Sequence, residues 1–328
     1  MEYRQLGKTG FEVSEISLGT WQVGGKWGSG FDFENARSVL DKAMDSGVNF
    51  IDTADVYEQG LSEESVGKAV RSRSERVYVA TKCGRQISPH VSEGYQPQIL
   101  QKYIEDSLTR MNLETLDLIQ LHCPPTEVYH RPELFGFFDR LKEQGKILNL
   151  GVSVETVEEA LKAIEYPNVT TVQIIFNLFR QKPSDRFFKE AQEKNVGIIV
   201  RVPLASGLLS GLYHSQTVFE SGDHRNFNRE GQAFDKGETF SGVEYQQGLN
   251  AVDELKNIFP GEDNLAPRAL QWILQFPEVS CIIPGASRVE QVASNLSVYN
   301  LPALAPSQID AMNRVYEYQI KEAVHHLW

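Results

Sequence analysis

Four side chains that can move or stabilise a proton stand at the ends of runs that are typical of β-strands. Asp52 and Tyr57 belong to the run IDTADVY, and Lys82 ends the run VYVATK. His122 ends the run LDLIQLH. Polar residues at the carboxyl ends of barrel strands are typical of catalytic sites. An acid, a phenol, an amine and an imidazole that converge on one point can protonate a carbonyl oxygen, which is half of an aldehyde reduction.

These four residue types suit each other chemically. A phenol is a poor acid at neutral pH, because its unperturbed pKa is about 10. An ammonium group beside it stabilises the phenolate and lowers that pKa, and Lys82 on the next strand is placed to do so. A buried lysine needs an anion in turn, which Asp52 supplies. His122 can donate from its ring to the carbonyl oxygen and stabilise the negative charge that develops there.

Each of the four also has an ordinary role when it is taken alone. Asp52 would cap a turn or a helix, and Lys82 would be a surface charge. His122 would be a satisfied core histidine, and Tyr57 would fill space. Four such residues at the strand ends of one barrel face are harder to explain in this way. We therefore treat them as one catalytic site, the tetrad.

Strand-like and helix-like segments alternate along most of the chain. Helical periodicity marks five segments, at residues 34–47, 62–71, 98–112, 133–146 and 157–166. Eight short, continuously apolar runs indicate strands that are buried on both faces, and they lie at residues 15–21, 48–54, 77–82, 116–122, 147–154, 170–176, 196–204 and 279–285. Eight strands with intervening helices predict an α/β fold, a (β/α)8 TIM barrel formed by residues 1–328 as a single domain.

Three segments lie outside this repeat. The residues before the first barrel strand contain Gly7-Lys8-Thr9-Gly10 between two extended runs, which predicts a β-hairpin that caps one end of the barrel. Residues 211–248 form a long loop after strand seven, either a mobile solvent loop or a functional lid. The helical tail carries His325 and His326, which we expect to be exposed.

Composition narrows the class of protein. The formal net charge is −12, which argues against nucleic acid or an anionic membrane as the main partner. The N-terminal residues lack the apolar stretch of a signal peptide, and no run is long enough to span a membrane. Three cysteines without a paired framework fit a reducing compartment, so we expect a cytoplasmic protein. Neither a metal-ligand spacing nor a complete Rossmann fingerprint occurs, since Phe33 replaces the third glycine.

Several segments together resemble the aldo-keto reductase family. Residues 46–70 contain D-T-A-x-x-Y followed by S-E-x-x-x-G, and LIQLHCP resembles the histidine strand of the family. KILNLGVS, PLASGLLSG and CIIPGASRVEQVASNL resemble three further segments of the family. The resemblance runs from about residue 3 to residue 320.

The resemblance implies an NADPH-dependent carbonyl reductase with Tyr57 as general acid, Lys82 and Asp52 as its tuning pair, and His122 as the donor that orients the carbonyl. Ser153 and Gln173 would hold the nicotinamide carboxamide. The cofactor-binding residues that it implies are Gly19, Thr20, Trp21, Ser153, Gln173, Arg201, Pro203, Leu204, Ser206, Gly207, Leu208, Ser210, Gly285, Ala286, Ser287, Arg288, Gln291 and Asn295.

The last residues of this set, from Gly285 to Asn295, are of types that can bind a phosphate. A glycine-containing turn that leads into a helix offers free backbone N–H groups. Arg288 adds a charge-assisted donor, which favours NADP over NAD. The alternative is an ordinary arginine in solvent at a helix start.

Three positions depart from the family pattern. Val154 stands where an asparagine is frequent, and Cys123 stands where a tryptophan is frequent. Arg201 takes the position of an aromatic residue that stacks on the nicotinamide. A guanidinium can stack on a ring, but its charge would disfavour the oxidised, cationic nicotinamide. This predicts weaker binding of NADP⁺ relative to NADPH.

Three functions remain open. The leading one is reduction of aldehydes and some ketones, in a pocket formed by Trp21, Trp27, Tyr57, His122 and parts of the long loop. The second is the reverse reaction, oxidation of a sugar or polyol. The third is a cofactor-sensing accessory subunit, because some proteins that resemble aldo-keto reductases serve ion channels in this way. The sequence leaves the oligomeric state open, with a homo-oligomer as one option.

Overall fold

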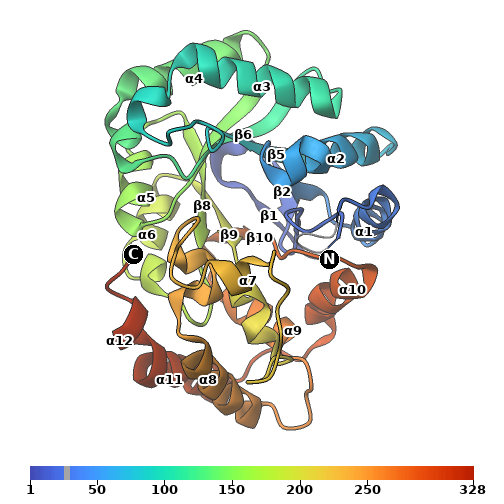
Figure 1. Cartoon of the computed structure of the whole chain (residues 1–328), viewed down its shortest axis with the longest axis vertical. Helices are drawn as coiled ribbons and strands as arrows, with labels where there is room; N and C mark the ends of the chain where they lie inside the picture. The colour runs from blue at the N-terminus through green and yellow to red at the C-terminus, as the bar shows by residue number, and fades with distance from the viewer. Residues whose placement is uncertain (26–29) are drawn as a thin grey trace.

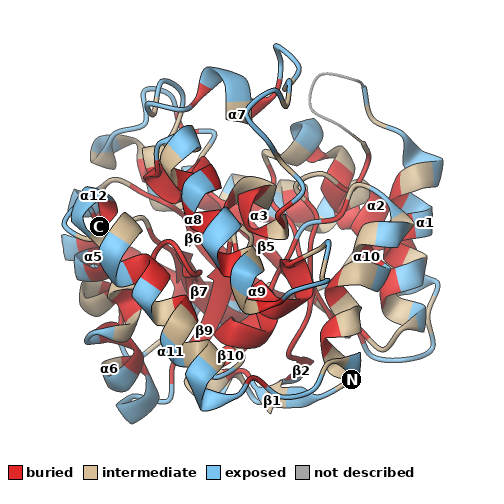
Figure 2. Cartoon of the chain, turned by 90° about the horizontal axis from the view of Figure 1, so that it is seen from below, coloured by how far each residue is buried: buried red, intermediate tan, exposed pale blue. Residues whose placement is uncertain are grey.

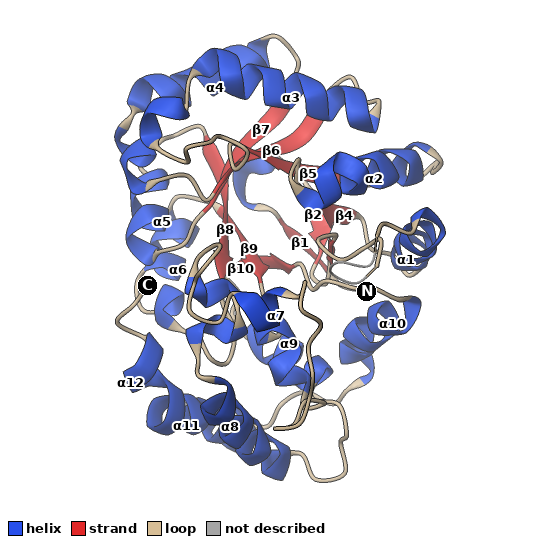
Figure 3. Cartoon of the chain, in the orientation of Figure 1, coloured by secondary structure: helices blue, strands red, loops and turns tan. Residues whose placement is uncertain are grey.

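The computed structural model describes residues 1–25 and 30–328, with the strands forming a ring inside a shell of helices (Figures 1 and 3). The strands are β1 Tyr3–Gln5, β2 Glu12–Ser14, β3 Leu18–Gly19, β4 Phe50–Asp52, β5 Tyr78–Cys83, β6 Leu116–His122, β7 Ile147–Ser153, β8 Val169–Ile175, β9 Gly197–Arg201 and β10 Val279–Ile282. The helices are α1 Phe33–Asp45, α2 Leu61–Arg71, α3 Pro97–Met111, α4 Pro132–Glu143, α5 Val157–Ala163, α6 Phe187–Glu193, α7 His224–Phe227, α8 Tyr245–Ile258, α9 Ala266–Ile273, α10 Val289–Leu296, α11 Pro306–Val315 and α12 Lys321–Val324.

Eight parallel strands form the barrel, in the order β10-β9-β8-β7-β6-β5-β4-β3. The two edges meet through parallel bridges between Ile16 and Ile282 and between Gly19 and Gly285. The Ser17 N–H donates to the Ile282 carbonyl at 2.8 Å across the same seam. The predicted (β/α)8 barrel is therefore confirmed, with all eight expected strands in sequence order.

The barrel interior is apolar at one end and polar at the other. Because side chains alternate along a strand, Phe50, Ala80 and Leu118 share the inner face with the residues two positions later. Those later residues are Asp52, Lys82 and Gln120, and all three are buried. The strands thus carry a polar layer directly above an apolar one, which places the tetrad at their carboxyl ends.

The N-terminal hairpin closes the apolar end, as predicted. Leu6, Phe11 and Val13 form one buried cluster with the inner apolar residues of the barrel. Gly7 permits the close approach, because its φ is +51° and a Cβ there would lie 2.2 Å from the Gly197 nitrogen. Figure 2 shows β1 and β2 at the opposite end of the molecule from α7. The hairpin therefore closes the end of the barrel that lies opposite the tetrad.

The long loop after β9 is a folded cover. We call residues 211–244 the covering segment, since α8 begins at Tyr245 and the expected boundary at residue 248 is too late. The segment contains α7 and buries the side chains of Asp223, His224 and Asn228. The segment is tied to the barrel by other contacts, since Ser206 Oγ donates to the Glu238 carbonyl at 2.9 Å and Asn177 Nδ2 donates to Ser241 Oγ at 2.7 Å. Its role as a lid stays a prediction.

The C-terminal tail also packs against this cover. The Trp328 indole is buried, donates to the Asp235 carboxylate at 3.0 Å, and lies 4.0 Å from the Arg180 guanidinium. His326 is exposed as expected, but the expectation for His325 is wrong. Its ring lies 2.7 Å from the Tyr316 hydroxyl and 2.9 Å from the Asp185 carboxylate. No helix in the described part of the chain has the length and apolarity that a membrane span requires.

Candidate active site

Lys82 is the centre of the tetrad. Its Nζ donates to Asp52 Oδ1 at 2.5 Å, to the Thr53 carbonyl at 2.8 Å and to the Tyr57 hydroxyl at 3.1 Å. The three acceptors satisfy all three protons of a buried ammonium group. The structure therefore brings Asp52, Tyr57 and Lys82 together in the arrangement that the sequence predicts.

Two glutamines complete the site around Asp52. Gln120 Nε2 and Gln173 Nε2 donate to Asp52 Oδ2 at 2.9 and 2.8 Å. Sequence reasoning did not identify Gln120, although it lies two residues before His122 and therefore on the same face of β6. Gln173, expected to hold a nicotinamide, also binds the carboxylate. With both oxygens of Asp52 hydrogen-bonded, the ion pair with Lys82 is fixed in one geometry.

The sequence predicts a lowered pKa for Tyr57 beside Lys82, and this prediction is wrong. Burial raises the pKa of Tyr57 above its ordinary value, and the opposing pull of the Lys82 charge does not cancel this effect. Burial also pulls the pKa of Lys82 down, but Asp52 and Tyr57 outweigh it and the net shift is upward. The phenol therefore keeps its proton at neutral pH beside a charged lysine, as a general acid must.

His122 is neutral at this site. Burial and the nearby charges of Lys82, Arg85 and Arg201 hold the pKa of His122 well below its usual value. Its ring stands edge-on to Tyr57 with 6.1 Å between the ring centres. Its Nδ1 is buried and makes no hydrogen bond to any residue that the structure describes. The imidazole can thus act as a neutral donor beside the tyrosine.

A cavity of about 370 Å³ opens above Tyr57 and His122. Trp21 lies in its wall, 6.2 Å from the Tyr57 ring and 5.1 Å from the His224 ring between their centres. Trp27, the other expected substrate residue, lies outside the described residues. The expected cofactor residues that line the cavity are Gly19, Thr20, Trp21, Gln173, Arg201, Pro203, Leu204, Ser206, Gly207, Gly285 and Gln291.

The other expected cofactor residues do not belong to the part of the cavity wall that the described residues form. Ser153 Oγ lies 3.3 Å from Cys123 Sγ, and Leu208 is buried against α8. The residues in this group are Ser153, Leu208, Ser210, Ala286, Ser287, Arg288 and Asn295. Arg288 is exposed at the start of α10, and the Ser287 N–H donates to Gln291 Oε1 at 2.8 Å. Their roles toward a cofactor stay predictions.

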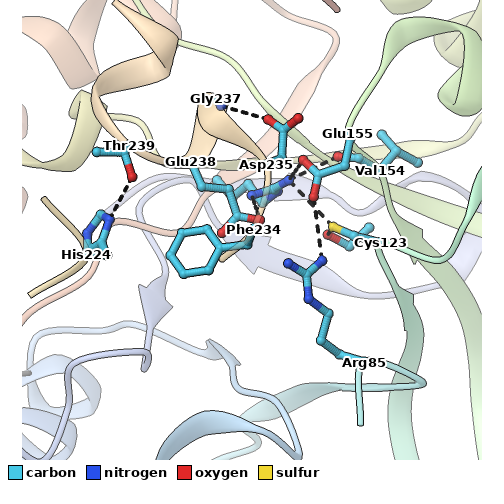
Figure 4. Close-up of polar contacts among 12 residues, drawn as sticks. Arg85, Cys123, Val154, Glu155, His224, Phe234, Asp235, Gly237, Glu238 and Thr239 are labelled. Carbon is cyan, nitrogen blue, oxygen red and sulfur yellow. Dashed lines mark hydrogen bonds and ion pairs between the residues drawn. The ribbon is translucent and has the colours of Figure 1, made fainter. Parts of the chain in front are cut away.

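Arg201 belongs to a buried charge cluster, which we define as Arg201, Glu155 and Glu238. Figure 4 labels the two glutamates. Its Nη2 lies 3.0 Å from Glu155 Oε2, and its Nη1 lies 3.3 Å from Glu238 Oε1. Two carboxylates thus surround the cation that was expected to face the nicotinamide. No pattern in the sequence indicates these partners, because Glu155 follows β7 and Glu238 lies in the covering segment.

Within the same cluster, the carboxyl group of Glu238 has a raised pKa. Burial raises the pKa of Glu238 to about 7, although the Arg201 charge opposes the shift. Cys123 joins the two carboxylates in a group compact enough for a metal ion, within 4.8 Å. The Arg201 guanidinium already contacts Cys123 Sγ at 3.6 Å and both carboxylates. A cation in that position makes the group a poor site for a metal.

Three relatives extend over most of the chain. It is 29% identical over 331 residues to "Aldo-keto reductase YhdN" of Bacillus subtilis, which covers 99% of this chain and 96% of that protein. It is 27% identical over 291 residues to "Aldo-keto reductase yakc [NADP(+)]" of Schizosaccharomyces pombe, covering 86% and 83%. It is 26% identical over 337 residues to "Probable voltage-gated potassium channel subunit beta" of Arabidopsis thaliana, covering 98% of both.

A solved structure agrees with the fold. The glycerol dehydrogenase AKR11B4 from Gluconobacter oxydans superposes with a TM-score of 0.77 at 27% identity, over 97% of this chain and 96% of that one. Residues 15–317 match the aldo/keto reductase family. The matched range contains all four tetrad residues and every strand of the barrel. This chain belongs to the aldo/keto reductase family, a family of oxidoreductases that act on small carbonyl compounds.

Proposed function

We propose that this protein reduces aldehydes and some ketones to alcohols with NADPH. The observation that carries the proposal is the position of Lys82 Nζ, which bridges the Tyr57 hydroxyl and the Asp52 carboxylate at the base of the cavity. This arrangement fits a proton donor that must become a phenolate and then recover its proton.

The protein's own residues would act on the carbonyl oxygen. Tyr57 keeps its proton until negative charge develops on that oxygen, and then transfers it. The Lys82 ammonium stabilises the phenolate that remains, while Asp52 keeps the lysine charged. Neutral His122 donates a hydrogen bond to the same oxygen and orients it. The hydride for the carbonyl carbon is the chemistry that NADPH supplies when it is bound.

The residues along the rest of the cavity fit such a cofactor. Ser206, Gly207 and Gly285 line it between β9 and α10, where backbone N–H groups can meet a phosphate. Arg288 is exposed at the start of α10 and would bind the 2′-phosphate that distinguishes NADP from NAD. The S. pombe relative, whose name includes NADP(+), supports the same choice.

The test is NADPH consumption with 4-nitrobenzaldehyde for the wild type, Tyr57→Phe and Tyr318→Phe. Loss of the acid should lower kcat by about 10²–10⁴-fold. Tyr318 is 83% exposed and far from the tetrad in sequence, so its variant controls for the substitution itself. Full activity of Tyr57→Phe would contradict the assigned acid.

Two other outcomes would replace the proposal. NADPH binding without turnover across several aldehydes would favour an accessory subunit, the role for which the Arabidopsis relative is named. Turnover of polyols with NADP⁺ but not of aldehydes would favour the oxidative direction, the one for which the Gluconobacter glycerol dehydrogenase is named. The same tetrad serves both directions by microscopic reversibility.

A further inference from the structure

Three arginines line the cavity beside the two carboxylates Asp52 and Glu238, although the chain as a whole is acidic. The formal net charge is −12, yet the cavity is lined by Arg85, Arg201 and Arg225. A cation that lines a cavity either has a protein partner or is available to a ligand. The partners of the three arginines therefore decide which of them can bind a substrate.

Two of these arginines are committed to protein partners. Arg201 is held by Glu155 and Glu238 in the charge cluster. Arg225 Nε lies 2.9 Å from Asp223 Oδ1, and its Nη1 donates to the Tyr213 hydroxyl at 2.5 Å. Both guanidinium groups therefore have their charge offset and part of their donor set occupied.

Arg85 is held more weakly, by one longer ion pair with Glu155. Its guanidinium makes no hydrogen bond to any residue in the described parts of the chain. The carboxylate atom that contacts it, Glu155 Oε1, is 3.7 Å away, and Glu155 already pairs with Arg201 (Figure 4). The Arg85 side chain remains 24% exposed. Its donors are thus free to bind an anion in the cavity.

The position of Arg85 points to the substrate and not to the cofactor. It lies two residues beyond the end of β5 and lines the cavity together with Tyr57 and His122. The residues that fit the cofactor phosphates follow β9 and β10, on the far side of the tetrad in the strand order. An anion bound by Arg85 would therefore belong to the molecule whose carbonyl faces Tyr57.

We propose that Arg85 selects carbonyl substrates that carry an anionic group, a carboxylate or a phosphate monoester. This rests on the proposed reductase function and names its substrate class. The planar guanidinium matches the paired oxygens of either group and is strengthened by its low exposure to water. The chemistry is shared by both kinds of anion, so the test must separate them.

The first experiment compares matched substrates. Succinic semialdehyde and 4-carboxybenzaldehyde are assayed against their methyl esters, and glyceraldehyde 3-phosphate against glyceraldehyde. The expected result is a kcat/KM at least about ten-fold higher for an anionic member than for its neutral partner, carried mainly by KM. The carboxylate and phosphate pairs show which anion is preferred. Equal values within all pairs would overturn the proposal.

Variants assign the selectivity to Arg85. Arg85→Met removes the charge and should bring the anionic-to-neutral ratio close to one, whereas Arg85→Lys should restore part of it. Arg186→Met is the matched control, because this arginine is 69% exposed at the start of α6 and is not among the residues that line the cavity. An unchanged ratio in Arg85→Met would assign any preference to another residue and refute the inference.

A binding measurement separates this inference from the proposed function. The affinities of benzoate and benzamide are measured with and without NADP⁺ present, for the wild type and Arg85→Met. Tighter binding of benzoate to the wild type, lost in the variant, would support the role of Arg85 even if no aldehyde were reduced. Equal binding of benzoate to both proteins would count against it whether or not turnover occurs.

Discussion

The tetrad layer and the charge cluster are both buried and polar, but they are built in different ways. Asp52 and Lys82 lie on adjacent strands, and the hydrogen bonds of the sheet fix their distance. Arg201 also ends a strand, but its two partners come from loops. The comparison shows that strand register positions Asp52 and Lys82, while loops supply the charges that surround Arg201.

The largest effect should come from breaking the tetrad layer. Lys82→Met would leave the Asp52 carboxylate buried without its counter-charge. Removing one partner of a buried ion pair costs about 3–5 kcal/mol, so the free energy of unfolding should fall by about that amount. Urea unfolding of both proteins measures it. Lys68→Met on the surface of α2, where an exposed pair contributes about 1 kcal/mol or less, is the control.

A loss below about 1 kcal/mol in Lys82→Met would mean that Gln120 and Gln173 are enough to stabilise Asp52. The layer would then depend on its hydrogen bonds more than on its ion pair.

The charge cluster should give a smaller, pH-dependent effect. Glu238 has its pKa raised from 4.5 to about 7 by burial, so the folded protein holds a proton that the unfolded chain releases at lower pH. Stability from this group is complete below about pH 4.5 and is lost as the pH rises toward 7. The slope is at most about 1.4 kcal/mol per pH unit.

Glu238→Gln should remove this slope, because glutamine cannot ionise. The difference in unfolding free energy between wild type and variant, measured across that pH range, reports it. The neighbouring Glu155, whose pKa shifts downward despite its burial because of Arg201 and Arg85, contributes with the opposite sign. Because Glu155 also raises the pKa of Glu238, the two carboxyl groups titrate together, and the measured difference reports the pair. A difference that stays constant with pH would mean that Glu238 is ionised throughout.

The smallest effect should come from the tail. Trp328→Phe keeps an aromatic ring against Arg180 but removes the N–H that donates to Asp235. One hydrogen bond of this kind contributes about 1 kcal/mol. Amide hydrogen exchange of residues 235–242 should become faster in the variant, with no comparable change in the barrel strands. Equal exchange would show that the indole N–H does not anchor the covering segment.

The sequence predicts best what depends on local patterns. Continuous apolar runs identified all eight barrel strands, and the polar residues at or just after the ends of three of them gave the four tetrad candidates. Gln120 could have been added, because it shares a face with His122. By contrast, the contact between His325 and Asp185 joins residues 140 positions apart in the sequence. The partners of Arg201 are also remote, and no periodicity along the chain encodes them.

The hairpin that seals the barrel has a practical consequence for handling the protein. Since β1 and β2 lie at the opposite end from α7, a support attached through the N-terminus would face away from the cavity mouth (Figure 2). The last residue, Trp328, is instead buried against Gly237 and Gly242 of the covering segment. A fusion there would disturb the packing of Trp328 against the covering segment. Immobilised protein should therefore keep free access to its active site when it is tethered by its first residue and not by its last.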